Sequence, residues 1–218
     1  MIAVKETKVR DVMTTSVVAV RRNADFKEMV TVMRSRKVSA FPVIDADGKV
    51  VGVVSEADLL LKQATPALPQ GAFRLAWRLR QQSKASGSTA ADVMTRPAVT
   101  ISQDATAGQA ARLMQSRRVK RLPVVDADGR LCGIVSRADV LSVYERPDSE
   151  IRDEVVKAVI IGEFALDELM FAVTVQSGIV TITGPVDKRA VALSLLAAVR
   201  YVEGVVGVRD RLSYPAEG

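Results

Sequence analysis

The feature that most constrains this chain is an internal repeat at a constant spacing of 81 residues. Residues 11–60 align without a gap with residues 92–141. The matching blocks are Asp-Val-Met-Thr at 11–14 and 92–95, Pro-Val-x-Asp-Ala-Asp-Gly at 42–48 and 123–129, and Gly-x-Val-Ser at 52–55 and 133–136. Such a repeat predicts two copies of one structural unit. Because one copy of about 50 residues is small for a stable core, we expect the two copies to pack together.

Each copy is predicted to fold as β-α-β-β-α, with a short strand after the Asp-Val-Met-Thr block. Asn23 and Asp104 are the expected N-caps of the first helix of each copy. The apolar residues with helical spacing are Phe26, Met29, Val30 and Met33 in the first copy, and Ala107, Ala110, Ala111 and Met114 in the second. Strands are predicted at 41–44 and 50–54, and at 122–125 and 131–135, joined by Asp-Ala-Asp-Gly turns whose glycine supplies a positive φ. A second helix is expected to begin at Ser55 or Ser136.

Composition indicates a soluble globular protein, since 48% of the 218 residues are hydrophobic and 26% are charged. The first residues lack the apolar run of a signal peptide, and no apolar stretch approaches the roughly 20 residues that a membrane span needs. The single cysteine, Cys132, has no partner for an internal disulfide, and its apolar neighbours predict a buried small side chain. We therefore expect a cytoplasmic location.

The absence of histidine excludes several kinds of enzyme. Without histidine there is no Ser-His-Asp or Cys-His nucleophile pair, and one cysteine cannot build a structural zinc site. We expect a protein that is not an enzyme. The formal charge is +6, but five basic residues lie between 61 and 90 where no acidic residue occurs. These are Lys62, Arg74, Arg78, Arg80 and Lys84. The rest of the chain is close to neutral, so nucleic acid is not the first choice of partner.

The order and spacing of the repeated motifs resemble the cystathionine-β-synthase (CBS) domain, here in the tandem pair called a Bateman module. The resemblance covers about two thirds of the chain. It implies two pseudo-symmetric β-α-β-β-α units with two ligand clefts, and a homodimer shaped as a flat disc. It also implies AMP, ADP, ATP, NAD or S-adenosylmethionine as a regulatory ligand, with no tightly bound cofactor.

The strongest ligand candidates lie where the last strand of each copy becomes a helix. Ser55 and Ser136 stand beside helix-start N–H groups that favour phosphate. One turn later, Asp58 and Asp139 can accept hydrogen bonds from the two hydroxyls of a ribose. The alternative is that Ser-x-x-Asp is only a capping box that starts a helix without any ligand.

The second copy carries more positive charge around this motif. Lys120, Arg121 and Arg137 stand where the first copy has Ser39, Ala40 and Glu56. A phosphate would gain charge-assisted hydrogen bonds there, so we expect the Asp139 side to bind anions better; the alternative is a merely solvated basic face. The resemblance adds further candidates from the strand starts and from the stretch that lines the clefts in the family. These are Phe41, Leu122, Pro123, Thr14, Val17, Thr95 and Ala98, although Pro42 and Pro123 are expected to shape the strand start rather than to touch ligand.

The basic linker, 63–90, separates the two copies. Phe73, Ala76 and Trp77 fall at helical spacing among arginines. A basic helix with aromatic residues suits an anionic membrane surface, whereas the competing interpretation packs its aromatics on the protein with the arginines in water.

The repeat ends near Pro147, and a different pattern follows. Ile151, Val155 and Val159 mark one helix face, 171–184 reads as a hairpin with a Ser177-Gly178 turn, Asp187 is the expected cap of a second helix, and 205–212 forms a last strand. Four glycines read as turn residues, namely Gly178, Gly184, Gly204 and Gly207. The α-β-β-α-β order, with Gly-Ile-Val-Thr-Ile-Thr-Gly at 178–184, resembles the BON domain, a family suspected of binding phospholipid.

The predicted fold class is therefore α+β, a tandem CBS pair followed by a small BON-like domain. The expected boundaries are 1–62 for the first repeat, 63–90 for the linker, 91–146 for the second repeat and 147–218 for the BON-like domain. Two functions remain open. One is a regulatory sensor that signals to a downstream protein and takes part in stress responses. The other is a membrane-associated scaffold in which the linker and the BON-like domain contact phospholipid.

Overall fold

The computed structural model describes residues 6–61 and 88–215. The helix predicted at 73–77 lies outside these residues. The chain forms two compact units, one of residues 9–137 and one that combines residues 6–8 with the chain from Ala138 onward.

The repeat has the β-α-β-β-α order expected from the sequence. In the first copy the elements are β1 (Val20–Arg21), α2 (Phe26–Arg36), β2 (Ala40–Ile44), β3 (Val50–Ser55) and α3 (Glu56–Leu60). In the second copy they are β4 (Ile101–Ser102), α6 (Ala107–Ser116), β5 (Arg121–Val125), β6 (Leu131–Ser136) and α7 (Arg137–Leu141). The prediction is confirmed, and both Asp-Ala-Asp-Gly turns place their glycine at positive φ, 80° at Gly48 and 79° at Gly129.

The two copies also share strand pairing. Each forms a three-stranded sheet in which the first strand runs parallel to the second and the second pairs antiparallel with the third. Ala40 pairs with Ser55, and Arg121 pairs with Ser136 at the same register. This register brings the residue that ends the third strand beside the start of the second strand in both copies.

Sheet and helix enclose an apolar core in each copy. Phe41, Val43 and Val54 of the first sheet are 0% exposed, and Met29 and Met33 of α2 are buried with them. The corresponding sheet residues Leu122, Val124 and Val135 are also 0% exposed. Ala107, Ala110 and Met114 are buried on α6, but Ala111 is exposed, so its predicted place on the buried face is wrong. Phe26 and Val30 are half-buried.

The predicted N-caps of the first helices are wrong by two residues. Asp25 caps α2 by accepting a hydrogen bond from the Glu28 N–H at 2.7 Å, and Thr106 caps α6 by accepting one from Gln109 at 3.1 Å. The delay has a tertiary cause. The carbonyls of Ala24 and Ala105, between the expected and the observed caps, accept hydrogen bonds from segments of the other copy, while Asn23 and Asp104 themselves lie in turns.

Those segments are two short helices, α1 (Val9–Val12) and α5 (Ala90–Val93), that are exchanged between the copies. The Val9 N–H donates to Ala105 O at 2.8 Å, so the helix that precedes the first copy packs on the second. The Ala90 N–H donates to Ala24 O at 2.9 Å, which is the reciprocal contact. Both helices are anchored by buried side chains, since Val9 and Ala90 are 0% exposed. The exchange makes the two copies one folded unit.

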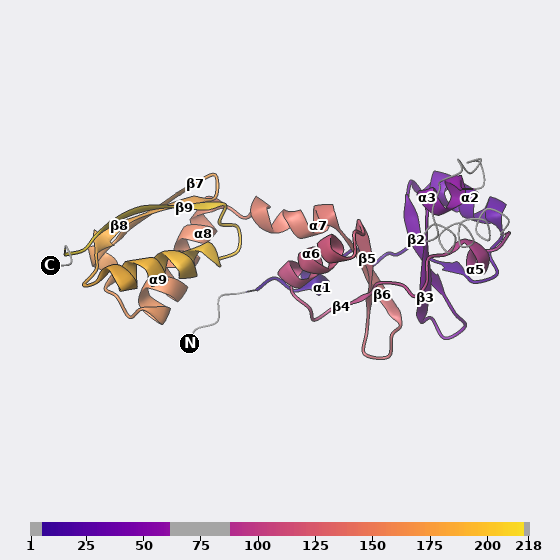
Figure 1. Cartoon of the computed structure of the whole chain (residues 1–218), viewed down its shortest axis with the longest axis horizontal. Helices are drawn as coiled ribbons and strands as arrows, with labels where there is room; N and C mark the ends of the chain where they lie inside the picture. The colour runs from indigo at the N-terminus through magenta and orange to yellow at the C-terminus, as the bar shows by residue number, and fades with distance from the viewer. Residues whose placement is uncertain (1–5, 62–87, 216–218) are drawn as a thin grey trace, which may run out of the picture. The chain divides into compact units, whose positions relative to one another are not determined.

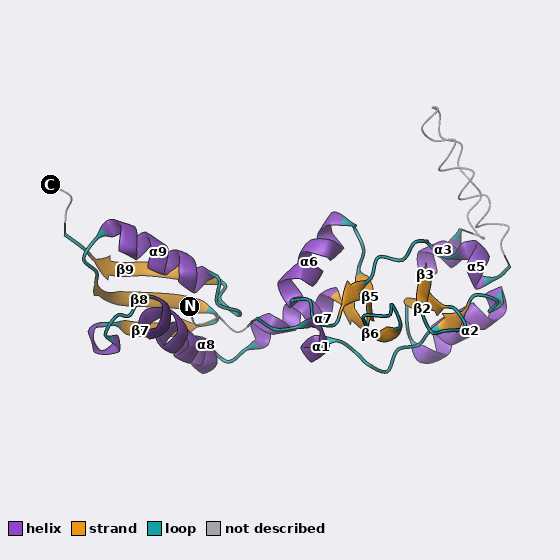
Figure 2. Ribbon diagram, turned by 90° about the horizontal axis from the view of Figure 1, so that it is seen from below, coloured by secondary structure: helices purple, strands orange, loops and turns teal. Residues whose placement is uncertain are grey.

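The predicted α-β-β-α-β order is present after Pro147. The first helix, α8 (Asp148–Glu154), continues as the π-helical η2 (Val155–Glu163). The elements that follow are β7 (Ala172–Gln176), β8 (Ile179–Pro185), α9 (Arg189–Arg200) and β9 (Gly207–Ser213). Two short 3-10 helices are also present, η1 (Ser142–Glu145) before α8 and η3 (Glu168–Met170) before β7. The helices cover one face of the sheet β7-β8-β9 (Figures 1 and 2). The cap of α9 is Lys188 and not Asp187, and Gly207 begins the last strand and is not a turn residue.

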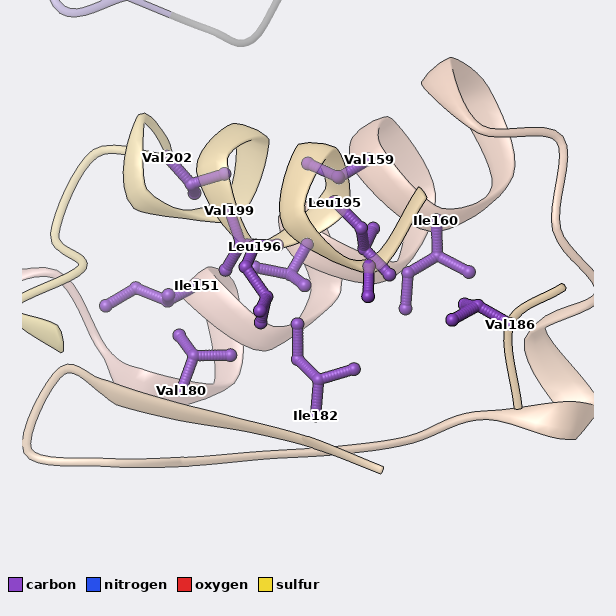
Figure 3. Close-up of a cluster of buried hydrophobic side chains, with 12 residues drawn as sticks. Ile151, Val159, Ile160, Val180, Ile182, Val186, Leu195, Leu196, Val199 and Val202 are labelled. Atoms are coloured by element: carbon purple, nitrogen blue, oxygen red, sulfur yellow. The ribbon is translucent and has the colours of Figure 1, made fainter. Parts of the chain in front are cut away.

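This second unit has a core of its own, shown in Figure 3. Ile151, Val155 and Val159 form the buried helix face that their spacing predicts, and they meet Val180 and Ile182 of β8. Leu195 and Val199 of α9, also 0% exposed, complete the layer. In the ranges 6–61 and 88–215, no helix is both long and apolar enough to cross a membrane.

Candidate functional site

The exchanged segments bring a methionine of each copy onto a glycine of the other. The Met94 side chain lies against Gly52 in β3, and a Cβ at that glycine would fall 2.9 Å from the Met94 Cγ. Met13 lies against Gly133 in β6, where a Cβ would fall 3.2 Å from the Thr14 carbonyl oxygen. The glycine of each Gly-x-Val-Ser motif therefore admits the methionine of the other copy's Asp-Val-Met-Thr motif. Sequence reasoning found both motifs but not this contact between them.

The residue after each methionine pairs with the other copy's last strand. The Thr95 N–H donates to Val53 O at 2.8 Å, and the Val53 N–H donates to Thr95 O at 3.1 Å. Thr14 and Ile134 form the same two bonds, both at 2.9 Å. Each candidate site is therefore composite, because the threonine comes from one copy and the Ser-x-x-Asp motif from the other.

The first composite site joins Ser55, Asp58 and Thr95. Asp58 Oδ2 accepts hydrogen bonds from the Ser55 N–H at 2.9 Å and from its hydroxyl at 2.7 Å. Asp58 Oδ1 accepts the Thr95 hydroxyl at 3.3 Å. The helix-capping alternative is thus present in the structure, since Ser55 and Asp58 bond to each other at the start of α3. The same carboxylate also faces a hydroxyl of the other copy, which a cap does not require.

The second candidate site contains Ser136, the last residue of β6. The Arg137 N–H donates to Lys120 O at 3.1 Å, which is the counterpart of the bond from the Glu56 N–H to Ser39 O at 3.0 Å. Asp139 stands in α7 at the position of Asp58, beyond residue 137 where the first compact unit ends. Its peptide oxygen accepts the Ser142 hydroxyl at 2.7 Å.

Arg121 belongs to the second copy by its backbone and reaches the first copy by its side chain. Its backbone pairs with Ser136 in the second copy, yet its guanidinium donates to the Ser39 hydroxyl in the first copy at 2.7 Å. The Ser39 carbonyl in turn accepts from the start of α3. The sequence placed all three basic residues at the second copy. In the structure, the Arg121 guanidinium lies at the edge of the first copy's site. Its counterpart in the first copy, Ala40, has no charged group that could reach the second copy in the same way.

The other predicted site residues differ in accessibility. Lys120 and Arg137 are exposed, and Arg137 Nη2 donates to Val119 O at 3.1 Å. Thr14 and Thr95 are exposed, whereas Val17 and Ala98 are half-buried. Phe41, Leu122 and Pro123 lie inside the sheets, and Phe41 and Leu122 are 0% exposed. The side chains of Phe41 and Leu122 are core residues and offer no accessible surface, and Pro123 is also buried.

The residue types at these sites suit a polyol and an anion better than a metal or a covalent step. Among residues 6–61 and 88–215, no group of three or more Cys, Asp or Glu side chains could hold a metal ion. Cys132 is half-buried, not fully buried as expected, and its Sγ donates to Val124 O at 3.4 Å. Burial raises the pKa of this thiol, with a further contribution from the Asp126 carboxylate, which disfavours the thiolate that nucleophilic chemistry needs.

Comparison with known proteins agrees with this geometry. A family model described as the CBS domain matches residues 9–64 and 90–146, more than half of the chain. The uncharacterized protein MJ1426 of Methanocaldococcus jannaschii is 33% identical over 149 residues, which cover 61% of this chain and 88% of that protein. The chloroplastic CBS domain-containing protein CBSX2 of Arabidopsis thaliana is 32% identical over 133 residues, 56% of each chain, so the match spans about half of that relative.

A solved structure is similar as well. The crystal structure of CBSX2 in complex with AMP has a TM-score of 0.56 and 32% identity, and the match covers 62% of this chain and 94% of that one. Two matched copies with exchanged segments define a tandem CBS pair. The chain belongs to the CBS-domain family.

Proposed function

We propose that this protein is a regulatory sensor whose CBS pair binds an adenine nucleotide. The observation that carries the proposal is the meeting of Asp58 with Thr95 at 3.3 Å, two polar residues from different copies at the start of α3. The similarity to CBSX2, which has been crystallised with AMP, supports the choice of ligand. Binding at a composite site gives the nucleotide a means to act, because a ligand that touches both copies favours one arrangement of the pair.

The first site would recognise the ribose and the phosphate through different groups. A carboxylate has about four acceptor positions, so Asp58 can keep its bonds to Ser55 while accepting a ribose hydroxyl at Oδ1. Arg121 reaches Ser39 beside this site and would donate charge-assisted hydrogen bonds to phosphate. The half-buried Val53 and Ala98 supply apolar surface for an adenine.

The second site would use the repeated residues Ser136, Asp139 and Thr14. Lys120 and Arg137 are exposed here and supply positive charge for a phosphate. Glu56 replaces Arg137 at the first site, so the two sites are expected to differ in affinity for anions. Because the Arg121 guanidinium bonds to Ser39, its charge lies beside the first site and does not favour the second one.

The wider role is a proposal of the same kind. We assign residues 147–218 to a BON-like domain, supported by its α-β-β-α-β order, and we expect the CBS pair to form a homodimer in the cytoplasm. The BON-like domain would pass the nucleotide signal to a downstream protein. The competing scaffold function predicts binding to anionic phospholipid, so co-sedimentation with anionic liposomes separates the two.

The test is isothermal titration calorimetry of the full chain with AMP, ADP, ATP, NAD and S-adenosylmethionine, with GMP as a matched control. At least one adenine compound should bind, and GMP should bind more weakly. The same compound should raise the melting temperature, because a ligand that binds only the native state stabilises it. Absence of binding by all five compounds would reject the proposed function.

A further inference from the structure

Two segments of chain connect the CBS pair with the C-terminal unit, and both lead away from the second candidate site. One segment runs from Thr14, which bonds to Ile134 of β6, back through α1 to Thr7. The other runs from Ser136 through α7 and η1 to Arg146. Residues 6–8, which precede α1, belong to the C-terminal unit, although α1 itself belongs to the CBS pair.

The two segments converge on one residue, Glu203, in the loop between α9 and β9. Its carboxylate accepts the Thr7 N–H at 2.8 Å and the Thr7 hydroxyl at 2.5 Å, one bond to each oxygen. Its backbone carbonyl accepts Arg146 Nη1 at 2.9 Å. The other arm of the same guanidinium forms an ion pair with Glu154 at 2.8 Å, in which the side chains are 21% and 12% exposed.

The loop that carries Glu203 is held tightly. Val202 is 2% exposed. Gly204 has a φ of 90°, and a Cβ there would approach Ile151 Cδ1 to 2.8 Å. The Val206 N–H donates to Gly178 O at 2.8 Å. The loop is therefore packed on α8 and on the β7-β8 turn.

We propose that Glu203 couples the second candidate site to the C-terminal unit by holding both chain segments that leave that site. A change at the Thr14–Ile134 pair passes along the four residues of α1 to the Glu203 carboxylate, and a change at Ser136 passes through α7 to the Glu203 carbonyl. The claim that a nucleotide signal uses this link rests on the proposed function. The link itself does not depend on that proposal.

Hydrogen exchange of the full chain without ligand tests the link. In Thr7→Val the hydroxyl is lost while the loop stays intact, and in Glu203→Ala both carboxylate bonds are lost. Exchange of the Thr14 and Ile134 amides should become several-fold faster in the first variant and about tenfold faster in the second, because hydrogen bonds to a charged group are the stronger kind. Glu163→Ala removes an exposed carboxylate from the same unit and should change neither amide.

Three outcomes decide the inference. Unchanged exchange at Thr14 and Ile134 in both variants would overturn it. If exchange in Glu203→Ala became faster throughout the core, including Val180 and Leu195, the Glu203 carboxylate would have a merely structural role in that variant. The result for Thr7→Val would then decide the inference. With AMP added, wild-type protein should show slower exchange at 200–207, and Thr7→Val should bind AMP but lose that response. If AMP binds the wild type without slowing exchange at 200–207, the coupling is overturned. If AMP does not bind, the proposed function is rejected, and the comparison of the variants without ligand still decides whether the link exists.

Discussion

Met94 and Gly52 come from different copies of the repeat, and the Met94 side chain occupies the space that a Cβ on Gly52 would need. Gly133 and Met13 repeat this relationship. Each contact lies directly beside a threonine that pairs with the opposite last strand. The glycine in Gly-x-Val-Ser is therefore needed for the close approach of two copies, which is what assembles the composite sites.

The first prediction concerns this approach. Gly52→Ala should destabilise the CBS pair by about 1–3 kcal/mol, the usual cost of overpacking a well-packed contact. Urea unfolding followed by circular dichroism measures the change. Gly108→Ala is the matched control, because its Cβ would meet no atom closer than 3.6 Å and the residue lies in α6. That variant should be neutral or more stable by about 0.5–1 kcal/mol. A Gly52→Ala protein as stable as Gly108→Ala would contradict the interpretation.

The repeat predicted the elements of each copy well, because alternation and helical spacing are local properties. Strand positions agree within one residue, and the turn glycines have the expected positive φ. The helix caps were predicted two residues too early. A single copy contains no sign that Ala24 and Ala105 bond to the opposite copy, and those bonds delay the helices.

The site was predicted less completely than the fold. Ser-x-x-Asp could be found from the repeat, but the partner of Asp58 is Thr95, which is 37 residues away and in the other copy. Arg121 was assigned to its own copy because side-chain reach cannot be read from position alone; its guanidinium bonds to Ser39. Phe41 and Leu122 were included through the family resemblance, although both lie in short apolar strands that the structure buries almost throughout.

A second prediction follows from the charge of Asp92. This carboxylate accepts the Thr89 hydroxyl at 2.8 Å and the N–H groups of Thr89 at 3.0 Å and Ser88 at 3.2 Å, and these bonds, the Thr89 hydroxyl first, lower its pKa. A group whose pKa falls on folding stabilises the native state above its unfolded pKa, about 3.9 for Asp. The contribution is lost as the pH falls through the lower folded value.

Wild-type protein should therefore be more stable than Asp92→Asn at neutral pH, and the difference should disappear as the pH falls below about 4. Thermal unfolding between neutral pH and pH 3 measures both proteins. Asp128→Asn, which changes an exposed turn carboxylate, is the control for general charge effects. A difference that grew on acidification would have the wrong sign for this mechanism.

The third prediction concerns the C-terminal unit. Fragment 138–218 should fold alone, because its core residues all lie between Ile151 and Val202. Fragment 148–218 lacks Arg146, which bonds to Glu154 and to the Glu203 carbonyl. It should be less stable by about 1–3 kcal/mol, the cost of leaving partly buried charged partners unsatisfied. Urea unfolding measures both, and Arg146→Ala in the longer fragment should reproduce most of the loss. Equal stability of the two fragments would place the boundary of the folding unit at Pro147.

The last prediction separates the two ligand sites. Asp58→Ala and Asp139→Ala each remove a carboxylate at the same position of the repeat, so each should weaken AMP binding at its own site by roughly tenfold or more, the usual loss for a charged hydrogen bond. Arg121→Ala should weaken the first site more than the second, because the guanidinium that this variant removes bonds to Ser39. Arg117→Ala removes an exposed arginine after α6 and should leave affinity unchanged. Calorimetry with AMP measures all four variants. If Arg121→Ala weakened the second site more than the first, its charge would act beside Ser136, where its backbone pairs, and not beside Ser39. If neither aspartate variant lost affinity, Asp58 and Asp139 would serve only to start α3 and α7.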